Sequence, residues 1–319
     1  MTGIRILSTG SQQARQVVTN DDMARVVETN DEWIRTRTGI RQRRFAGEEE
    51  STTTLAVGAA REAVRALEET GRSRQEIGAV LVATFTPSDL VPNTACLVQE
   101  ALGLPEELLA LDINAACSGF LAGLRLSQGL LEQQPEKLVL IVGAEVISRV
   151  TDFTDRGTCV LFGDAAGAAV VGADPSRPFW WSTGARGGGQ ALSCAGIPVG
   201  GGPVGKIAMN GKDVFRFAVE AIPAGIREVL AKSGAELSEM DWFICHQANA
   251  RILSHAAKAM GIPLEKFYMN LDRYGNTSAA SIPVALDEMN REGLLREGMK
   301  LMLAGFGGGL TWGAAQIIW

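Results

Sequence analysis

Residues 59–83, AAREAVRALEETGRSRQEIGAVLVA, fall into register with residues 222–246, IPAGIREVLAKSGAELSEMDWFICH, when the chain is moved along itself by 163 positions. Each stretch predicts an amphipathic helix ending in Leu-x-x-x-Gly, then a polar turn, then an apolar strand. Shorter matches follow in the same order: residues 101–105 lie over 259–263 at an offset of 158, and residues 139–143 over 301–305 at an offset of 162. The common order and nearly constant offset predict an internal duplication.

The pattern around these matches predicts the content of each half: strand, helix, strand, helix, strand, helix, then two more strands. Continuously apolar strands such as residues 80–83 are typical of sheets covered by helices on both faces. We therefore predict a layered α/β protein whose halves, residues 1–172 and 173–319, pack about a pseudo-twofold axis. Residues 174–178, DPSRP, break the pattern near the join.

Residues 184–205 carry eight glycines between Gly187 and Gly205 and predict a long mobile loop. Two interpretations stay open for it: a plain surface excursion, or a gate near a functional site.

Composition excludes several classes of protein. The 319 residues carry a net charge of −6, which argues against a nucleic-acid binder. Five scattered cysteines without CxxC spacing argue against a disulfide framework and a zinc site. Cys96, Cys159 and Cys245 lie in apolar surroundings and are expected to be buried, inert thiols. The first residues lack the apolar core of a signal peptide, and residues 138–143 are too short to span a bilayer, so we expect a cytoplasmic protein without a membrane segment.

Cys117 lies in DINAACSGF, residues 112–120, between a short apolar run and a helix-like stretch. A thiol at such a strand-to-helix turn is placed where the helix dipole favours its thiolate. His246, one of two histidines, ends a predicted strand of the second half, and Asn276 follows the predicted third strand of that half. Strand ends that meet helix starts are where open α/β folds bind ligands. We predict Cys117 as a nucleophile with His246 and Asn276 as partners. A buried structural thiol, a core histidine and a turn asparagine are the alternatives.

The triple glycine at residues 307–309 follows a predicted strand, which is reminiscent of a dinucleotide-binding loop. Ten residues follow Gly309, too few for the helix and distal acidic residue that such a site requires.

Eight short motifs carry a resemblance to a known family: NDEWI at 30–34, RTGIR at 37–41, AACSGF at 115–120, DRGT at 155–158, FGDAAGA at 162–168, HQAN at 246–249, YGNTSAASIP at 274–283 and FGGG at 306–309. In this order, over essentially the whole chain, they resemble β-ketoacyl-acyl-carrier-protein synthase III of the thiolase-like superfamily. The resemblance implies a thiolase-like α-β-α-β-α sandwich of two duplicated halves. It also implies a decarboxylative Claisen condensation that initiates fatty-acid synthesis.

In that reaction Cys117 would take the acyl group of an acyl-CoA as a thioester. Malonyl-acyl-carrier protein would then lose CO₂, and its carbanion would attack the thioester. His246 and Asn276 would stabilise the enolate, since donors aimed at developing charge accelerate such steps. The backbone N–H groups of Cys117 and Gly308 would form a second oxyanion hole. The resemblance further implies a homodimer, no metal, and no permanently bound cofactor beyond acyl-CoA as substrate.

Further site residues come from the same resemblance. CoA contacts carry over to Trp33, Arg37, Arg156, Arg251 and Lys212, although these cations could also be solvated surface charges. Lys212 stands where the family often has asparagine. The acidic carrier protein would dock on Arg216, Arg251 and Lys258. Val91 and Phe306 would line the acyl pocket. Val91 replaces a bulky aromatic residue of members limited to short acyl groups, so we expect room for longer or branched starters.

Single residues distinguish this function from those of related enzymes. A thiolase needs a second cysteine in the segment at 304–309, which has none, and elongating synthases use two histidines where this chain has His246 and Asn276. A non-condensing acyltransferase or acyl-binding module, and a specialised homologue of secondary metabolism, remain alternatives.

Overall fold

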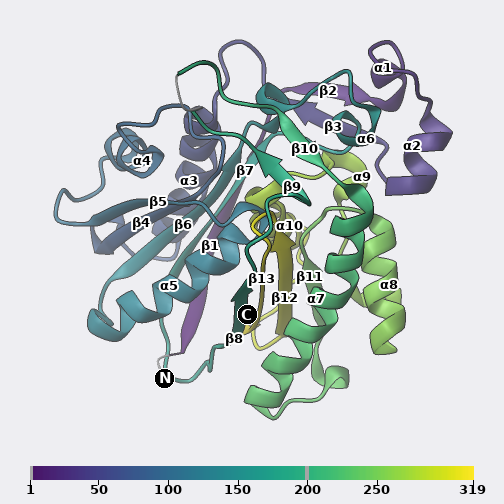
Figure 1. Ribbon diagram of the computed structural model, residues 1–319. Helices are drawn as coiled ribbons and strands as arrows, with labels where there is room; N and C mark the ends of the chain where they lie inside the picture. Colours follow the sequence, from purple (N-terminus) through teal and green to yellow (C-terminus); the bar gives the residue numbers. More distant parts are fainter. Residues whose placement is uncertain (1–2, 198–200) are drawn as a thin grey trace.

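The computed structural model describes residues 3–197 and 201–319. Its first half is built on a five-stranded sheet with the strand order β1-β7-β6-β4-β5 (Figure 1). β4 runs parallel to β5 and β6, whereas β7 is antiparallel to both β6 and β1. The strand bounds are β1 Ile4–Gln13, β4 Ile77–Ala83, β5 Leu109–Ile113, β6 Leu138–Glu145 and β7 Ala165–Ala173.

A second sheet repeats this arrangement, with the strand order β11-β12-β13-β8 in place of β4-β6-β7-β1. β11 is parallel to β12, and β13 is antiparallel to both of its neighbours. The bounds are β8 Trp180–Ala185, β11 Trp242–Cys245, β12 Lys300–Gly307 and β13 Thr311–Ile318.

Within the described residues, the second half has no counterpart of β5, so the predicted third strand there was wrong. A single parallel bridge between Phe243 and Phe267 takes its place. The physical reason is the Gln247 side chain, whose amide donates to the Tyr268 carbonyl at 3.0 Å and accepts from the Asn270 N–H at 3.1 Å. These side-chain hydrogen bonds satisfy backbone groups that a longer strand would offer to β11.

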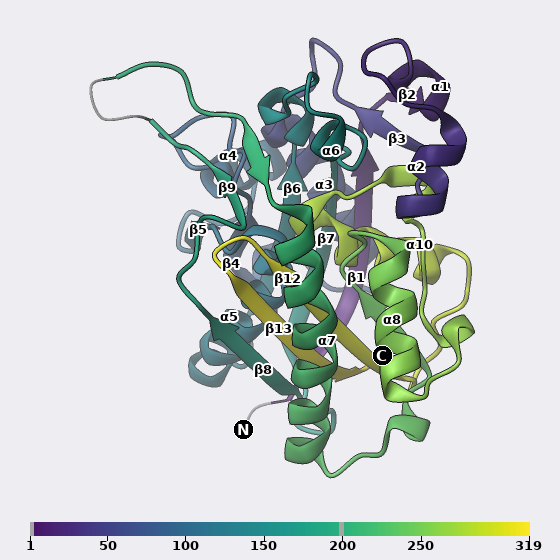
Figure 2. The same cartoon turned by 45° about the vertical axis from the view of Figure 1, so that its right-hand side comes forward.

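Helices and sheets alternate in five layers, which confirms the predicted sandwich. α3 and α4 cover the outer face of the first sheet, α5 and α10 lie between the sheets, and α7 and α8 cover the outer face of the second sheet (Figures 1 and 2). The helix bounds are α3 Thr52–Glu69, α4 Thr94–Leu102, α5 Gly119–Gln133, α7 Gly211–Ser233, α8 Ala250–Met260 and α10 Ser281–Arg291.

The central strands are apolar throughout because both of their faces are covered. In β6, Val139 and Ile141 face the middle layer, whereas Leu140 and Val142 pack with the outer helices. Neighbouring side chains of a strand point to opposite faces, so a strand buried on both faces loses the alternation of polar and apolar residues.

The offsets found in the sequence recur as matching elements. β6 and β12 begin 162 positions apart, at Leu138 and Lys300, and end at the same offset. α3 and α7 are followed by Gly71 and Gly234, which have left-handed φ angles of 84° and 72°. Such a conformation favours glycine after a helix. The division at residues 172 and 173 stays our interpretation of the join between β7 and β8.

Smaller elements surround the sandwich. The N-terminal half carries β2 Gln16–Thr19, α1 Asn20–Met23, α2 Asp31–Thr38 and β3 Gln42–Phe45, and short helices lie at α6 Arg156–Cys159 and α9 Leu271–Tyr274. Single-turn 3₁₀ helices lie at η1 Arg74–Glu76, η2 Ala116–Ser118, η3 Ile147–Val150, η4 Leu237–Glu239, η5 Leu264–Lys266 and η6 Ser278–Ala280. Within the described residues, no helix combines the length and the apolar content needed to cross a membrane.

The glycine-rich stretch is not one long loop. Residues Leu192–Cys194 form β9, which pairs antiparallel with β10, Ile207–Met209. Residues 198–200 of the predicted loop lie outside the described residues. A second correction concerns Cys96, which is exposed although Cys159 and Cys245 are buried. α4 buries Ala95 and Val98 and leaves the face that carries Cys96 uncovered.

Candidate active site

Cys117 lies in the tight connection between β5 and α5, as the sequence predicted. It is the middle residue of η2, two positions before α5 begins at Gly119, and is 8% exposed. The preceding Ala116 has a left-handed φ of 46°. A Cβ at Gly307 would lie 2.7 Å from the Cys117 nitrogen, so only glycine lets β12 approach the thiol backbone this closely.

The thiol is protonated in the resting site. Burial raises the pKa of Cys117 to about 12, and the negative charge of Glu145 adds to this shift. A hydrogen bond from Ser278 and one from the Cys117 backbone act in the opposite direction but are smaller than the effect of burial. The expected preference for the thiolate was therefore wrong for the resting state, because desolvation of the anion outweighs the favourable helix start.

His246 follows β11 directly and is held at both ends. Its backbone N–H donates to the Ala304 carbonyl at 2.8 Å, and its Nδ1 lies 2.8 Å from Ser281 Oγ. Burial lowers the pKa of His246 to about 3, so the imidazole is neutral near neutral pH. The Phe306 ring lies edge-on at 5.4 Å between centroids.

Asn276 is fixed by its own backbone and by its neighbour. Its N–H donates to the Leu161 carbonyl at 2.8 Å, and its Oδ1 accepts from the Ser278 N–H at 2.9 Å. Because the oxygen is already engaged, the amide of Asn276 is oriented to offer its NH₂ group to a substrate.

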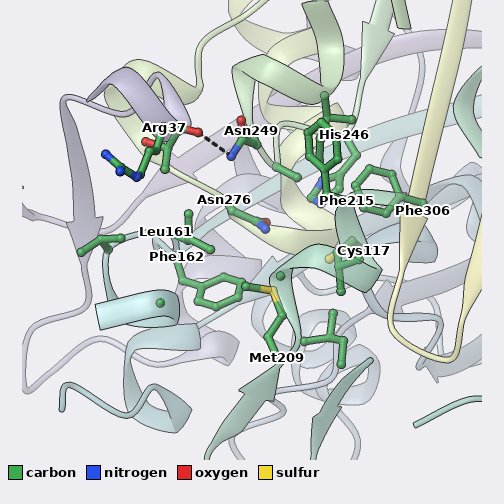
Figure 3. A pocket seen from close by; sticks show the side chains of 18 of the residues that line it. Arg37, Cys117, Leu161, Phe162, Met209, Phe215, His246, Asn249, Asn276 and Phe306 are labelled. Atoms are coloured by element: carbon green, nitrogen blue, oxygen red, sulfur yellow. Dashed lines mark hydrogen bonds between the residues drawn. The ribbon is translucent and has the colours of Figure 1, made fainter. Parts of the chain in front are cut away.

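These three side chains meet at one cavity. Figure 3 shows Cys117, His246 and Asn276 around the same space, with Phe306 beside His246. The cavity has a volume of about 230 Å³ and extends to Trp33 and Arg37. A second cavity of about 360 Å³ also borders Cys117 and is lined by Phe85 and Ser278. Cys117, Phe162 and Leu192 border both cavities, so the thiol lies where the two cavities adjoin.

The residues expected to contact CoA lie mainly near the open end of the first cavity. The guanidinium groups of Arg37 and Arg156 lie 4.6 and 4.7 Å from the centre of the Trp33 ring. Arg251 lies 5.7 Å from the ring of Phe215, which lines the cavity. Lys212 is exposed on α7 and does not line the cavity, although the adjacent Gly211 does.

The residues expected at the acyl pocket are placed differently. Phe306 lines the first cavity beside His246 and not the second, and its place in the acyl pocket stays a prediction. β12 directs this side chain toward the layer of α7, where it contacts Phe217. Val91 is 89% exposed on the single chain and lines neither cavity. Gly308 lines the second cavity.

The three cations expected to bind the carrier protein are exposed on α7 and α8, which pack against each other (Figure 2). Arg251 and Lys258 are seven residues apart on α8 and lie on one face of it. Arg216 of α7 forms a 3.8 Å ion pair with Asp213.

Sequence reasoning missed the polar residues that support the site. Ser281 contacts His246, Ser278 contacts Asn276 and Cys117, and Glu145 lies behind them. Glu145 is fully buried at the end of β6, whose other residues are all apolar. A carboxylate that closes such an apolar run is a signal the sequence does contain.

The site holds a thiol that borders two cavities and is faced by a neutral imidazole and an amide. On a five-layer sandwich, these features define a condensing enzyme of the acyl-transfer class. Comparison with known proteins specifies the family. Residues 111–185 match the family description 3-oxoacyl-(acyl-carrier-protein) synthase III, and residues 230–319 match its C-terminal part. The chain belongs to the β-ketoacyl-acyl-carrier-protein synthase III family, whose members initiate fatty-acid synthesis.

Relatives match along the whole chain. The β-ketoacyl-acyl-carrier-protein synthase III of Clostridium acetobutylicum is 42% identical over 100% of this chain and 99% of its own length. The crystal structure of the Aquifex aeolicus enzyme is 41% identical, covers 100% of both chains and gives a TM-score of 0.91. The priming β-ketosynthase of the R1128 polyketide pathway gives a TM-score of 0.91 at 32% identity, over 99% of this chain and 96% of that one.

Proposed function

We propose that Cys117 is the acyl acceptor and that this chain condenses an acyl-CoA with malonyl-acyl-carrier protein. The observation that carries the proposal is the position of Cys117 where two cavities adjoin. The first cavity would admit the pantetheine arm past Trp33, and the second would receive the acyl chain. The N–H groups of Cys117 and Gly308 would stabilise the thioester oxyanion.

His246 and Asn276 would act in the second stage. The Ser281 hydroxyl accepts from the Gln247 N–H at 3.4 Å, so its own hydrogen is free to bond His246 Nδ1. The imidazole proton then lies on Nε2, which points a donor at the malonyl thioester oxygen together with the Asn276 amide. As CO₂ leaves, negative charge builds on that oxygen, and preorganised neutral donors stabilise it.

Intact-protein mass spectrometry tests the two stages. The enzyme is mixed with acyl-CoAs of two to ten carbons and then with malonyl-acyl-carrier protein. An acyl adduct on Cys117 that disappears as the β-ketoacyl carrier forms supports the proposal. Absence of any adduct would overturn it and leave a non-condensing role.

The likeness to the R1128 priming synthase supports a second candidate, a starter-loading enzyme of secondary metabolism with the same chemistry. An unusual preferred starter in the same experiment would favour this candidate over fatty-acid initiation.

Trp33 and Lys258 are proposed to serve different substrates, so their variants act as controls for each other. Trp33→Ala should raise KM for acyl-CoA about tenfold, because base stacking on an aromatic ring contributes about 1–3 kcal/mol. Transfer from an acyl thioester that lacks the nucleotide should not change. Equal effects on both donors would show that Trp33 acts only through the fold.

Lys258→Glu, in contrast, should raise KM for malonyl-acyl-carrier protein and leave that for acyl-CoA unchanged, with an effect that weakens at high salt. Arg61→Glu, an exposed charge reversal on α3, is the matched control.

Val91 is proposed to complete the acyl pocket of a partner subunit in a homodimer, since it is exposed on the single chain. The Val91→Phe variant should lower the rate of Cys117 loading with eight-carbon acyl-CoA about tenfold relative to acetyl-CoA, because overpacking costs about 1–3 kcal/mol. Val26→Phe, at a valine 56% exposed outside both cavities, is the control. Strict preference of the native enzyme for acetyl-CoA would contradict the proposed room for longer starters.

Cytoplasmic localisation stays a prediction.

A further inference from the structure

Glu145 is a buried carboxylate behind the nucleophile that the proposed reaction does not use. It is 0% exposed, and every group that donates a hydrogen bond to it within the described residues is neutral. These donors are Thr84 Oγ1 at 3.2 Å, the N–H groups of Phe85 and Thr86 at 3.2 Å each, Thr86 Oγ1 at 2.5 Å and Ser278 Oγ at 3.1 Å. Burying a carboxylate without a cation is unfavourable, so its presence calls for a reason.

The fold itself does not require this carboxylate. Glu145 closes β6, and the residue 162 positions later that closes β12 is Gly307. The connections beside the two strand ends also match. Ala116 and Ser278 are 162 positions apart and have left-handed φ angles of 46° and 50°. The second half therefore forms the same strand end without any side chain at the position of Glu145.

Ser278 connects Glu145 to the nucleophile. Its hydroxyl donates to Glu145 Oε1 at 3.1 Å, and Ser278 lines the second cavity together with Cys117, whose pKa it lowers. The three side chains come from three segments, at η2, at the end of β6 and at η6. A hydroxyl can accept a proton on one side while it donates its own on the other.

We propose that Ser278 and Glu145 form a proton relay behind Cys117, in which the Glu145 carboxylate takes the thiol proton through the Ser278 hydroxyl. The relay rests on the proposed role of Cys117 as acyl acceptor. Ser278 and Glu145 act on the thiol of Cys117, and neither is proposed to contact the substrate.

The proton balance closes over both stages. In acyl transfer, the Cys117 S–H bond breaks and a bond from sulfur to the acyl carbon forms, while the carbon–sulfur bond to CoA breaks. Ser278 accepts the thiol proton and passes its own proton to Glu145, and the CoA thiolate takes a proton from solvent. In condensation, the bond from Cys117 sulfur to the acyl carbon breaks as the carbon–carbon bond forms. Glu145 then returns its proton through Ser278 to the departing Cys117 thiolate.

The resting charges fit this direction of transfer. Burial raises the pKa of Glu145 to about 7, and the thiols of Cys117 and Cys194 are the titratable groups that its charge affects. The accepting carboxylate is present above that pH and lost below it. Acylation should therefore slow as the pH falls below about 7. The neutral His246 has a pKa of about 3 and contributes no such change.

The experiment measures the rate of acyl-Cys117 formation by rapid quench and intact mass, from weakly acidic to weakly alkaline pH. Glu145→Gln and Ser278→Ala should each slow acylation about 100-fold at pH 8, within the range of general-base effects. Glu145→Asp should restore at least about tenfold of the loss, because a carboxylate is again present. Ser278→Ala should fold, since Ala116 already holds the matching left-handed position.

A matched control and a second half-reaction separate relay from structure. Thr84→Val removes a hydrogen bond to Oε2 of the same carboxylate, whereas Ser278 bonds Oε1, and it should change acylation less than about threefold. Decarboxylation of malonyl-acyl-carrier protein in a Cys117→Ala background should fall much less with Glu145→Gln than acylation does.

Three results would overturn the relay: acylation by Glu145→Gln within about threefold of the native rate, an unchanged pH profile, or equal loss of both half-reactions with a lowered unfolding temperature. Failure of the native enzyme to form any acyl-Cys117 would instead overturn the proposed function, and no variant is needed to see it.

Discussion

Cys117→Ala is expected to lower condensation at least about 10⁴-fold, because removal of a covalent nucleophile eliminates the acyl-enzyme path altogether. Decarboxylation of malonyl-acyl-carrier protein should persist, since the donors for that step are His246 and Asn276. CO₂ release and acyl-adduct mass, measured on the same samples, distinguish the two steps.

Cys245→Ala is the matched control for this variant, because Cys245 is also a fully buried thiol in the core beside β12. It should retain both steps apart from a moderate loss of stability. Acyl-enzyme formation by Cys117→Ala on any other cysteine would show that the nucleophile has been assigned to the wrong residue.

Loss of either donor at the malonyl site should give the opposite pattern. His246→Ala and Asn276→Ala are each expected to slow CO₂ release about 10²–10³-fold, the cost of one oxyanion donor in other enzymes. Acylation of Cys117 should continue, because neither side chain is needed for it in the proposed relay. His255→Ala, at the other histidine, which is exposed on α8, is the control.

The pH profile of the decarboxylation step checks the state of His246. An ordinary histidine titrates near pH 6.5, but burial lowers the pKa of His246 to about 3. The neutral donor is therefore present throughout the range above that value and is lost only below it. CO₂ release by the Cys117→Ala variant should show no inflection near neutral pH. A midpoint near 6.5 assigned to His246 would contradict its neutral role.

Much of the fold was predictable because it repeats. The matches at offsets of 163 and 162 marked helices and strands that recur in both halves, and apolar periodicity decides such elements locally. The missing third strand of the second half was not predictable in this way. A long-range side chain, Gln247, satisfies the backbone of residues 268–270 there.

Local sequence placed Cys117 and His246 after strands, because a strand-to-helix connection is a property of neighbouring residues. Asn276 instead follows α9, so the strand predicted before it was wrong. It could not give their protonation states. Those follow from burial among both halves, which raises the pKa of Cys117 to about 12 and lowers that of His246 to about 3. Desolvation depends on everything packed around a group, and most of those residues are far away in the chain.

The sequence by itself determined the duplication, the apolar strands, and Cys117 and His246 at strand ends, since each depends on nearby residues. The tertiary structure alone decided that Glu145 of the first half lies against Ser278 of the second, 133 positions away, and that Cys117 borders two cavities. Such contacts form where the two halves meet, and no periodicity within either half records which side chains face each other across that junction.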